Sequence, residues 1–104
     1  MQIEITSKDM AKAIAQQIEQ ATGKDCEAYS NVAGSVIIMH NTMIARITPL
    51  PRVVDVTPTA GPFVDRITKI PLETRSVNGL MEIAHAIDEA ASHLLAAAAI
   101  AIKH

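Results

Sequence analysis

The chain has 104 residues, of which 49% are hydrophobic and only 2% aromatic, and its formal net charge is −2. This length suits one compact domain, residues 1–104, with a core of aliphatic and alanine side chains. The weak charge and the scarcity of stacking aromatic residues argue against nucleic-acid binding.

The first element predicted is a short strand in residues 2–6, which alternate in hydrophobicity. A helix follows over residues 8–22. Ser7 is a suitable N-cap because its hydroxyl can accept a hydrogen bond from a free backbone N–H of the first turn, and Gly23 is suited to end the helix. The predicted buried face of this helix consists of Met10, Ala11, Ile14, Ile18 and Ala21.

Three strands are predicted next, over residues 25–30, 35–40 and 42–48. The dipeptide His40-Asn41 is short enough for a tight hairpin between the last two strands, since asparagine tolerates the positive φ of such turns. The sequence "PLP" at 49–51 should interrupt the sheet because proline lacks the backbone donor, and residues 52–56 can add an edge strand.

The segment from Thr57 to Val77 has the weakest pattern. Its apolar residues after Pro62 recur at near-helical spacing, which favours one or two helical turns ended by Pro71; they are Phe63, Val64, Ile67 and Ile70. A strand through residues 66–75 is the alternative, and Pro71 would then have to lie on a sheet edge.

A long helix is predicted from about Leu80 to the end of the chain, capped by Ser76 or Asn78. Its expected buried face comprises Leu80, Ile83, Ala84, Ile87, Ala91, Leu94, Leu95, Ala98 and Ile102. The order of elements predicts an α+β two-layer sandwich. An antiparallel sheet of three to five strands would carry the N-terminal helix and the long C-terminal helix on one face.

The end of this helix, "LLAAAAIAIKH" at 94–104, has lost the polar side of the preceding turns. A helix that is apolar all round is normally buried all round, whereas a two-layer sandwich covers only one side of it. The other side could be covered by residues 57–77, by a second copy of the chain or by a different protein. We expect a homodimer with Ala96, Ala97 and Ile100 in the self-association surface, since small residues allow two helices to approach closely.

One stripe of the last helix combines Glu82, His85, Glu89 and His93. His85, Glu89 and His93 are weak candidates for a metal site, because Glu-x-x-His on a helix occurs in carboxylate-bridged metal centres. A solvated face with Glu–His pairs is the favoured interpretation.

The remaining motifs predict no catalytic residue and no cofactor. Cys26 lies between two acidic residues, which disfavour a thiolate, and is expected to be a small buried hydrophobe. The four glycines are isolated, so neither common phosphate-binding loop is present.

The location of the protein is predicted from two further features. The first ten residues lack the basic and apolar stretches of a signal peptide, and the apolar C-terminal stretch is about half of the ~20 residues that a membrane span requires. A cytoplasmic protein with no membrane segment is the expectation, and the single cysteine, which cannot form an internal disulfide, agrees with it.

The middle of the chain, residues 46–75, carries five basic residues against three acidic ones. The residues expected to contact a partner, with an acidic protein surface preferred to nucleic acid, are Arg52, Arg66, Lys69 and Arg75. The leading interpretation is a small non-enzymatic protein-interaction module, such as a regulator or inhibitor. The alternatives are a small-molecule or metal-binding domain using the His/Glu stripe, and nucleic-acid binding through the basic middle segment.

Overall fold

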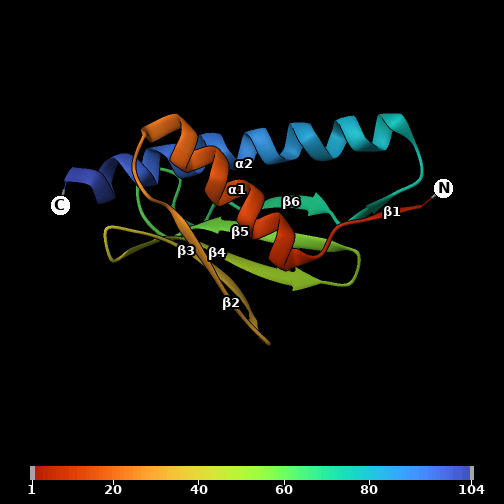
Figure 1. Ribbon diagram of the computed structural model, residues 1–104, viewed down its shortest axis with the longest axis horizontal. Coiled ribbons are helices and arrows are strands. Elements are labelled where there is room, and N and C mark those ends of the chain that lie inside the picture. Colours follow the sequence, from red (N-terminus) through yellow and green to blue (C-terminus); the bar gives the residue numbers. More distant parts are fainter. Residues whose placement is uncertain (1, 104) are drawn as a thin grey trace.

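The computed structural model describes residues 2–103, which form an α+β fold with two helices on one side of an antiparallel sheet (Figure 1). The elements in chain order are β1 (Ile3–Glu4), α1 (Ser7–Thr22), β2 (Glu27–Asn31), β3 (Gly34–Met39), β4 (Thr42–Leu50), β5 (Val53–Pro58), β6 (Thr68–Pro71), β7 (Glu73–Thr74) and α2 (Val77–Lys103). Strands β2 to β6 form a five-stranded antiparallel meander, and β1 pairs with β7 in a separate two-stranded sheet. The predicted fold class is confirmed.

The core lies between the two helices and the sheet face beneath them. Burial alternates along β3 and β5, so that every second side chain points towards the helices. Helix α1 contributes the predicted face, except that Ala21 is exposed. Aliphatic side chains and alanines fill the interface, and the largest members are Met10, Ile14, Ile18, Ile37, Met39, Ile44, Ile47, Ile70 and Leu94.

Helix α1 begins one residue earlier than predicted. The N-cap is Thr6, whose side chain accepts a hydrogen bond from the backbone N–H of Asp9 at 3.1 Å, and Ser7 is the first helical residue. Two adjacent hydroxyl residues can each serve as a cap, so the sequence pattern alone does not separate them. The helix ends at Gly23 as expected, with φ of 70° and its N–H donating to Glu19 O at 2.8 Å.

The hairpin between β3 and β4 forms where it was predicted. His40 and Asn41 both have positive φ, at 48° and 61°, as in the type I′ turns that suit two-residue hairpins. The prediction that "PLP" interrupts the sheet is wrong, because β4 continues to Leu50. Pro49 lies beyond the last residue pair of β3 with β4, Ser35 with Ile47, and its ring lies near Gly34, where an ideal Cβ would be 3.2 Å from Pro49 Cδ.

The segment 57–77 differs most from the favoured prediction. It contains a turn over residues 62–65 and the strands β6 and β7, so the helix is wrong and the alternative strand is correct. Pairing with β6 satisfies the backbone N–H and C=O groups on the free side of β5, which a helix at residues 63–70 would leave without a partner strand. Strand β5 is therefore an inner strand, not the predicted edge strand. Pro71 ends β6, which is an edge strand, as that alternative required.

Helix α2 starts at Val77, and Ser76 is its cap, with its hydroxyl oxygen accepting from Gly79 N–H at 3.0 Å. The fully buried residues of α2 are Ile83, Ala90, Ala91, Leu94, Ala97, Ala98 and Ala101. Leu80 and Ala84, predicted to be buried, are exposed, because the first turns of α2 extend past the end of β6 (Figure 1).

Candidate interaction surface

The apolar end of α2 is covered in part by the chain itself. The segment 59–66 (the 59–66 loop) crosses the helix so closely that an ideal Cβ on Gly61 would lie 3.2 Å from the Cα and N atoms of Ala97. Gly61 has φ of 84°, a conformation that glycine adopts readily. Of the three candidates for covering this helix, the structure places residues from 57–77 against it.

Three side chains hold the 59–66 loop against α2. The rings of Phe63 and His93 lie 4.8 Å apart between centroids, and the guanidinium carbon of Arg66 lies 5.4 Å from the Phe63 centroid. His93 therefore leaves the solvated stripe on which the sequence pattern placed it. Its Nδ1 atom is buried without a hydrogen-bond partner among the described residues 2–103.

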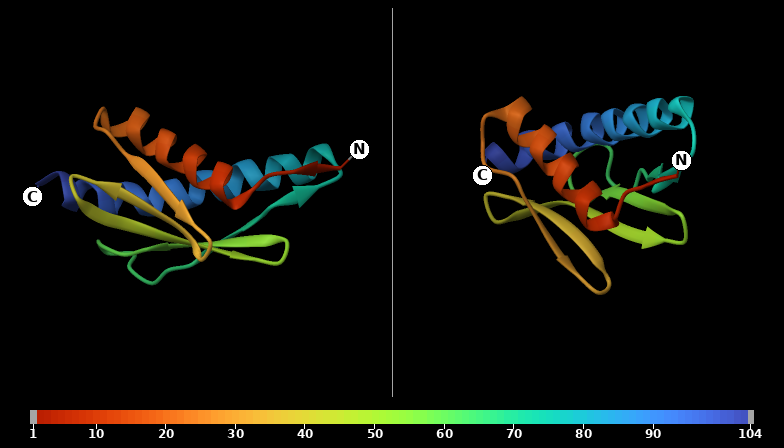
Figure 2. Two further views of the ribbon diagram at one scale, coloured as in Figure 1. Left: turned by 60° about the horizontal axis from the view of Figure 1, so that its bottom comes forward. Right: turned by 45° about the vertical axis from the view of Figure 1, so that its right-hand side comes forward.

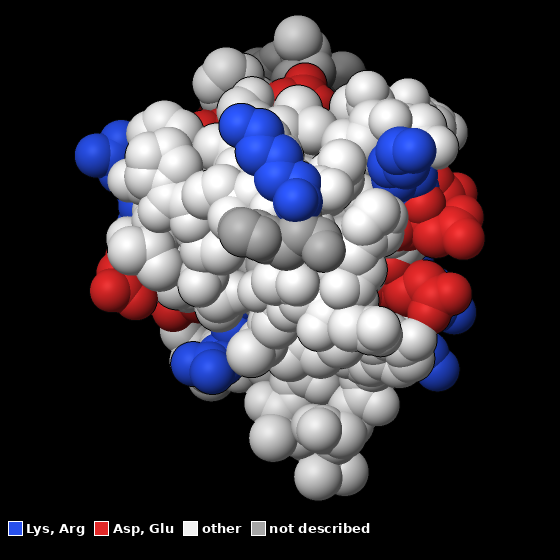
Figure 3. All heavy atoms as spheres, turned by 90° about the vertical axis from the view of Figure 1, so that its left-hand side faces the viewer, with Lys and Arg blue, Asp and Glu red and all other residues white. Residues whose placement is uncertain are grey.

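This covering changes what the predicted self-association residues can contribute. Ala97 has no exposed surface, because the 59–66 loop and the core enclose it, and Ala96 is half-buried. Ile100 remains 38% exposed. The end of the molecule that carries the C-terminus shows mostly uncharged residues, with one basic side chain across its upper middle and separate charged side chains at its sides (Figure 3).

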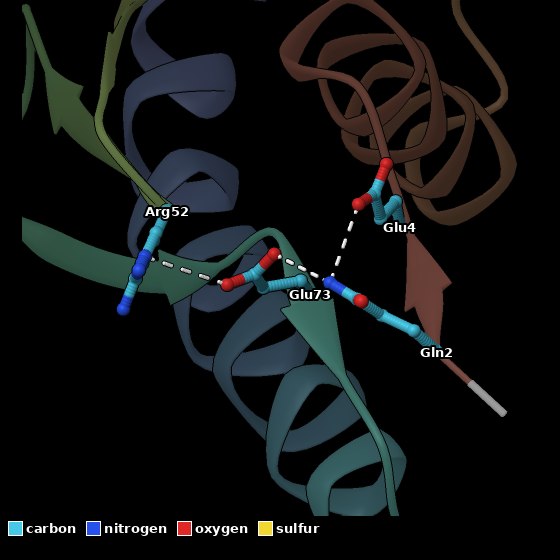
Figure 4. A network of polar contacts seen from close by, with 4 residues as sticks. All are labelled: Gln2, Glu4, Arg52 and Glu73. Atoms are coloured by element: carbon cyan, nitrogen blue, oxygen red, sulfur yellow. Dashed lines mark hydrogen bonds and ion pairs between the residues drawn. The ribbon is translucent and has the colours of Figure 1, made fainter.

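Two of the four predicted partner-binding residues are engaged in ion pairs. Arg52 lies in the β4–β5 turn, and its Nε atom is 3.6 Å from Oε1 of Glu73. The other Glu73 oxygen accepts from the Gln2 side-chain amide at 2.9 Å, and Gln2 also reaches Glu4 at 3.3 Å (Figure 4). Arg52 thus belongs to a network that joins the β4–β5 turn to β1 and β7.

The other three basic residues do not converge with Arg52. Lys69 projects from β6 and pairs with Asp55 of β5 at 3.0 Å. Arg66 lies just before the start of β6. Arg52 lies at the other end of this strand, where its backbone oxygen accepts a hydrogen bond from the N–H of Leu72, the residue after β6, at 2.9 Å. Arg75 lies between β7 and α2. The basic middle segment is therefore spread along the edge strand β6.

The metal candidates are likewise separated, since His85 and Glu89 are exposed while His93 packs on Phe63. Within residues 2–103, no group of three or more His, Cys, Asp or Glu side chains is arranged to hold a metal ion. Cys26 is buried, and burial, reinforced by the carboxylates of Glu19 and Glu27, raises its pKa to about 11. Its thiol is therefore protonated at neutral pH and is a poor nucleophile.

A different surface emerges on the sheet face opposite the helices, here called the outer face (Figure 2). Neither helix covers it, yet it carries large apolar side chains. Tyr29 of β2 lies opposite Val36 of β3, and Ile38 of β3 lies opposite Met43 of β4. Tyr29 is 53% and Met43 is 37% exposed. These four residues form the outer apolar cluster.

An acidic pocket of about 250 Å³ adjoins the outer apolar cluster. Tyr29 donates a hydrogen bond from its hydroxyl to Glu27, and this bond, together with the Glu27 charge, raises the pKa of Tyr29. The residues lining the pocket are Asp25, Glu27, Tyr29, Ile38, His40 and Asn41. On the other side of the cluster, Arg46 lies opposite Val36.

Sequence reasoning missed this surface although its signal was present. Consecutive apolar residues at 36–39 and 53–54 show that each of these strands has apolar side chains on both sides. The pattern does not say which side the helices cover. The site residues predicted from the sequence lie instead at the apolar end of α2 and in the basic segment 46–75.

A groove between the two helices has a volume of about 490 Å³. Its polar rim is closed in part by Gln17, whose side-chain amide donates to Asp88 at 3.3 Å. Ala21, Ala91 and Leu95 form its apolar part. Its large apolar residue, Leu95, is half-buried, whereas Tyr29 of the outer face is 53% exposed.

Comparisons with protein-family models, curated proteins and solved structures found no significant match for this chain. Among residues 2–103, neither helix combines the length and the apolar character needed to cross a membrane.

Proposed function

We propose that this protein is a small non-enzymatic interaction module that binds another protein through the outer face of its sheet. The observation that carries the proposal is the outer apolar cluster, which stays partly exposed in the folded chain. An antiparallel sheet with one free face normally alternates apolar and polar side chains, and the free face is the polar one. Here Tyr29, Val36, Ile38 and Met43 form an apolar cluster on the part of the free face made by β2, β3 and β4.

The energetic argument favours a protein partner. Covering the exposed parts of a tyrosine and a methionine, together with two half-buried aliphatic side chains, would gain roughly 25 cal/mol for each Å² of apolar area removed from water. Aromatic residues and methionine are also enriched in the centres of protein interfaces. The outer apolar cluster therefore has the composition of an interface centre.

The acidic pocket defines the chemistry of the partner more closely. Asp25 and Glu27 line the pocket beside Tyr29, and Glu27 accepts a hydrogen bond from the Tyr29 hydroxyl. A lysine or arginine side chain could lie along the Tyr29 ring and place its charge between the two acids. The expected partner surface thus combines apolar side chains with at least one basic residue. A regulator or inhibitor would suit such a binding role.

The experiment is a selection of peptides or small domains that bind the purified protein, followed by affinity measurements on three variants. Met43→Lys places a charge in the outer apolar cluster, and Glu27→Gln removes one carboxylate of the pocket. Val64→Lys is the matched control, because Val64 is 48% exposed but lies in the 59–66 loop, away from the outer face.

Ligands for the outer face should lose at least tenfold in affinity with Met43→Lys and several-fold with Glu27→Gln. They should keep their affinity with Val64→Lys, and ligands with basic residues should predominate. Selected ligands that respond to Val64→Lys and ignore Met43→Lys would refute the proposal.

A further inference from the structure

The two edges of the five-stranded sheet differ in how they are protected against pairing with another strand. Edge strands normally carry lysine, proline or a bulge, which prevent association. Strand β6 has two of these features, Lys69 and Pro71. Strand β2 reads Glu-Ala-Tyr-Ser-Asn and has neither lysine nor proline, and the irregularity of the sheet lies between β3 and β4. Only the β2 edge is left open by this criterion.

The β2 edge is also accessible. Four of its five residues are exposed, and the β2–β3 hairpin projects away from the helices (Figure 2). In an antiparallel ladder, alternate residues direct their N–H and C=O groups away from the neighbouring strand. Because β2 pairs with β3 on one side only, these groups form a row along its free edge. Such a row is a template for another extended strand.

We propose that the occupant of this edge is β2 of a second copy, paired antiparallel about a two-fold axis at Tyr29. A two-fold interface must be self-complementary, and β2 meets this condition in this register. Glu27 would lie opposite Asn31 of the other copy, an acid facing an amide. Ala28 would lie opposite Ser30, two small residues, and the two Tyr29 rings would meet at the axis.

The charges on β2 agree with this register. The only charged residue of the strand is Glu27. In the Tyr29-centred pair the two Glu27 Cα atoms would be offset by four residues, about 13 Å at ~3.3 Å per residue, so like charges are not opposed. The dimer would join both meanders into one sheet and bring the two outer apolar clusters side by side. This inference shares Tyr29 with the outer apolar cluster but can fail or hold apart from the proposed function, since the pairing itself is made by the backbone of the strand edge.

The first test is the solution mass measured by light scattering after size exclusion over a hundredfold range of protein concentration. The mass should rise with concentration to twice that of one chain. Tyr29→Lys should abolish the rise, because two ammonium groups would meet at the axis. Met43→Lys is the matched control. Met43 lies on the same face but two strands from the edge, about 10 Å at ~4.8 Å per strand, and this variant should still dimerise.

The second test traps the register by disulfide formation in a Cys26→Ala background. In an antiparallel pair the opposed Cα atoms lie about 4.5 to 5.5 Å apart, within the range that a disulfide bridges. Tyr29→Cys should therefore give a covalent dimer under mild oxidation. Glu27→Cys, on the same strand and the same face, should give at least tenfold less.

Two results would overturn the proposal. One is a monomer at every concentration, with no cross-linking in Tyr29→Cys. The other is a dimer that Tyr29→Lys leaves intact; if Ile100→Lys dissociates that dimer, the contact lies on the end of α2. Binding of a selected ligand by a monomeric protein would leave the proposed function standing while this inference fails.

Discussion

The contact between the 59–66 loop and α2 can be tested by adding one methyl group, in Gly61→Ala. The wild-type residue has φ of 84°, and an added Cβ would meet Ala97 Cα and N at 3.2 Å and Ala96 C at 3.3 Å. All three are backbone atoms of a helix, so they cannot move aside as the end of a side chain would. The substitution therefore combines backbone strain with a steric conflict at the helix.

The magnitude follows from these two effects. A Cβ in the left-handed region costs about 1 to 2 kcal/mol, and an extra methyl in a packed interface about 1 to 3 kcal/mol. Gly23→Ala is the matched control. Its φ of 70° is also left-handed, but nothing lies within 4 Å of the added Cβ. It should therefore show the strain alone, and Gly61→Ala should be less stable by a further 1 to 3 kcal/mol or so.

The assay is equilibrium unfolding in urea monitored by circular dichroism. For a domain of this size the dependence on urea is about 1.5 kcal/mol/M, so the Gly61→Ala midpoint should lie about 0.7 to 2 M below that of Gly23→Ala. The corresponding loss of about 1 to 3 kcal/mol is substantial beside the total free energy of unfolding of a small domain, roughly 5 to 15 kcal/mol. Equal midpoints for the two variants would refute the close packing of the loop on the helix.

Three further predictions concern other parts of the core and the helix ends. Leu94→Ala, at a fully buried position, should lower the free energy of unfolding by about 2 to 5 kcal/mol, whereas Ile100→Ala, at a partly exposed one, should cost less than about 1.5 kcal/mol by the same urea assay. Ser76→Ala removes the hydrogen bond to Gly79 N–H at the start of α2 and should cost about 1 kcal/mol, while Ser76→Asp should retain most of the stability; equal losses in both would contradict the capping role. The pKa of Cys26 is raised in the folded state from 9.0 to about 11, so the unfolded thiol ionises first and the folded state loses stability as the pH rises from 9 to 11. The fall in urea midpoint between pH 8 and pH 10.5 should accordingly be smaller in Cys26→Ala than in the wild type, and identical falls would mean that Cys26 does not titrate as the structure implies.

Much of the architecture could be predicted from local patterns. The apolar face of α1, the Gly23 terminus and the His40-Asn41 hairpin each depend on residues within a few positions of one another, and the structure confirms them. The predicted N-cap, Ser7, is one residue away from the actual one, Thr6, because both side chains offer the same hydroxyl chemistry. Periodicity also identified both helices and the central strands, and hence the α+β class.

Errors arose where a partner distant in sequence decides the structure. Residues after Pro62 have near-helical spacing, yet Thr68 to Pro71 form a strand because β5 offers them a ladder of backbone partners. Pro49 is compatible with β4 because it lies beyond the last residue pair of β3 with β4 and beside Gly34, which has no side chain to conflict with the proline ring. Neither circumstance is visible within a short sequence window.

At the apolar end of α2 and on the outer face, too, the sequence decides one part of the result and the tertiary structure the other. By itself, the sequence determined that the last turns of α2 are apolar on all sides and that the strands have two apolar sides. Tertiary structure alone decided that Gly61 and Phe63 cover the helix at Ala97 and His93, while Tyr29 and Met43 stay exposed. The physical reason is that hydrophobic burial is non-directional. Composition and periodicity state how much apolar surface must be covered, whereas the topology of the whole chain determines which part of it is left for a partner.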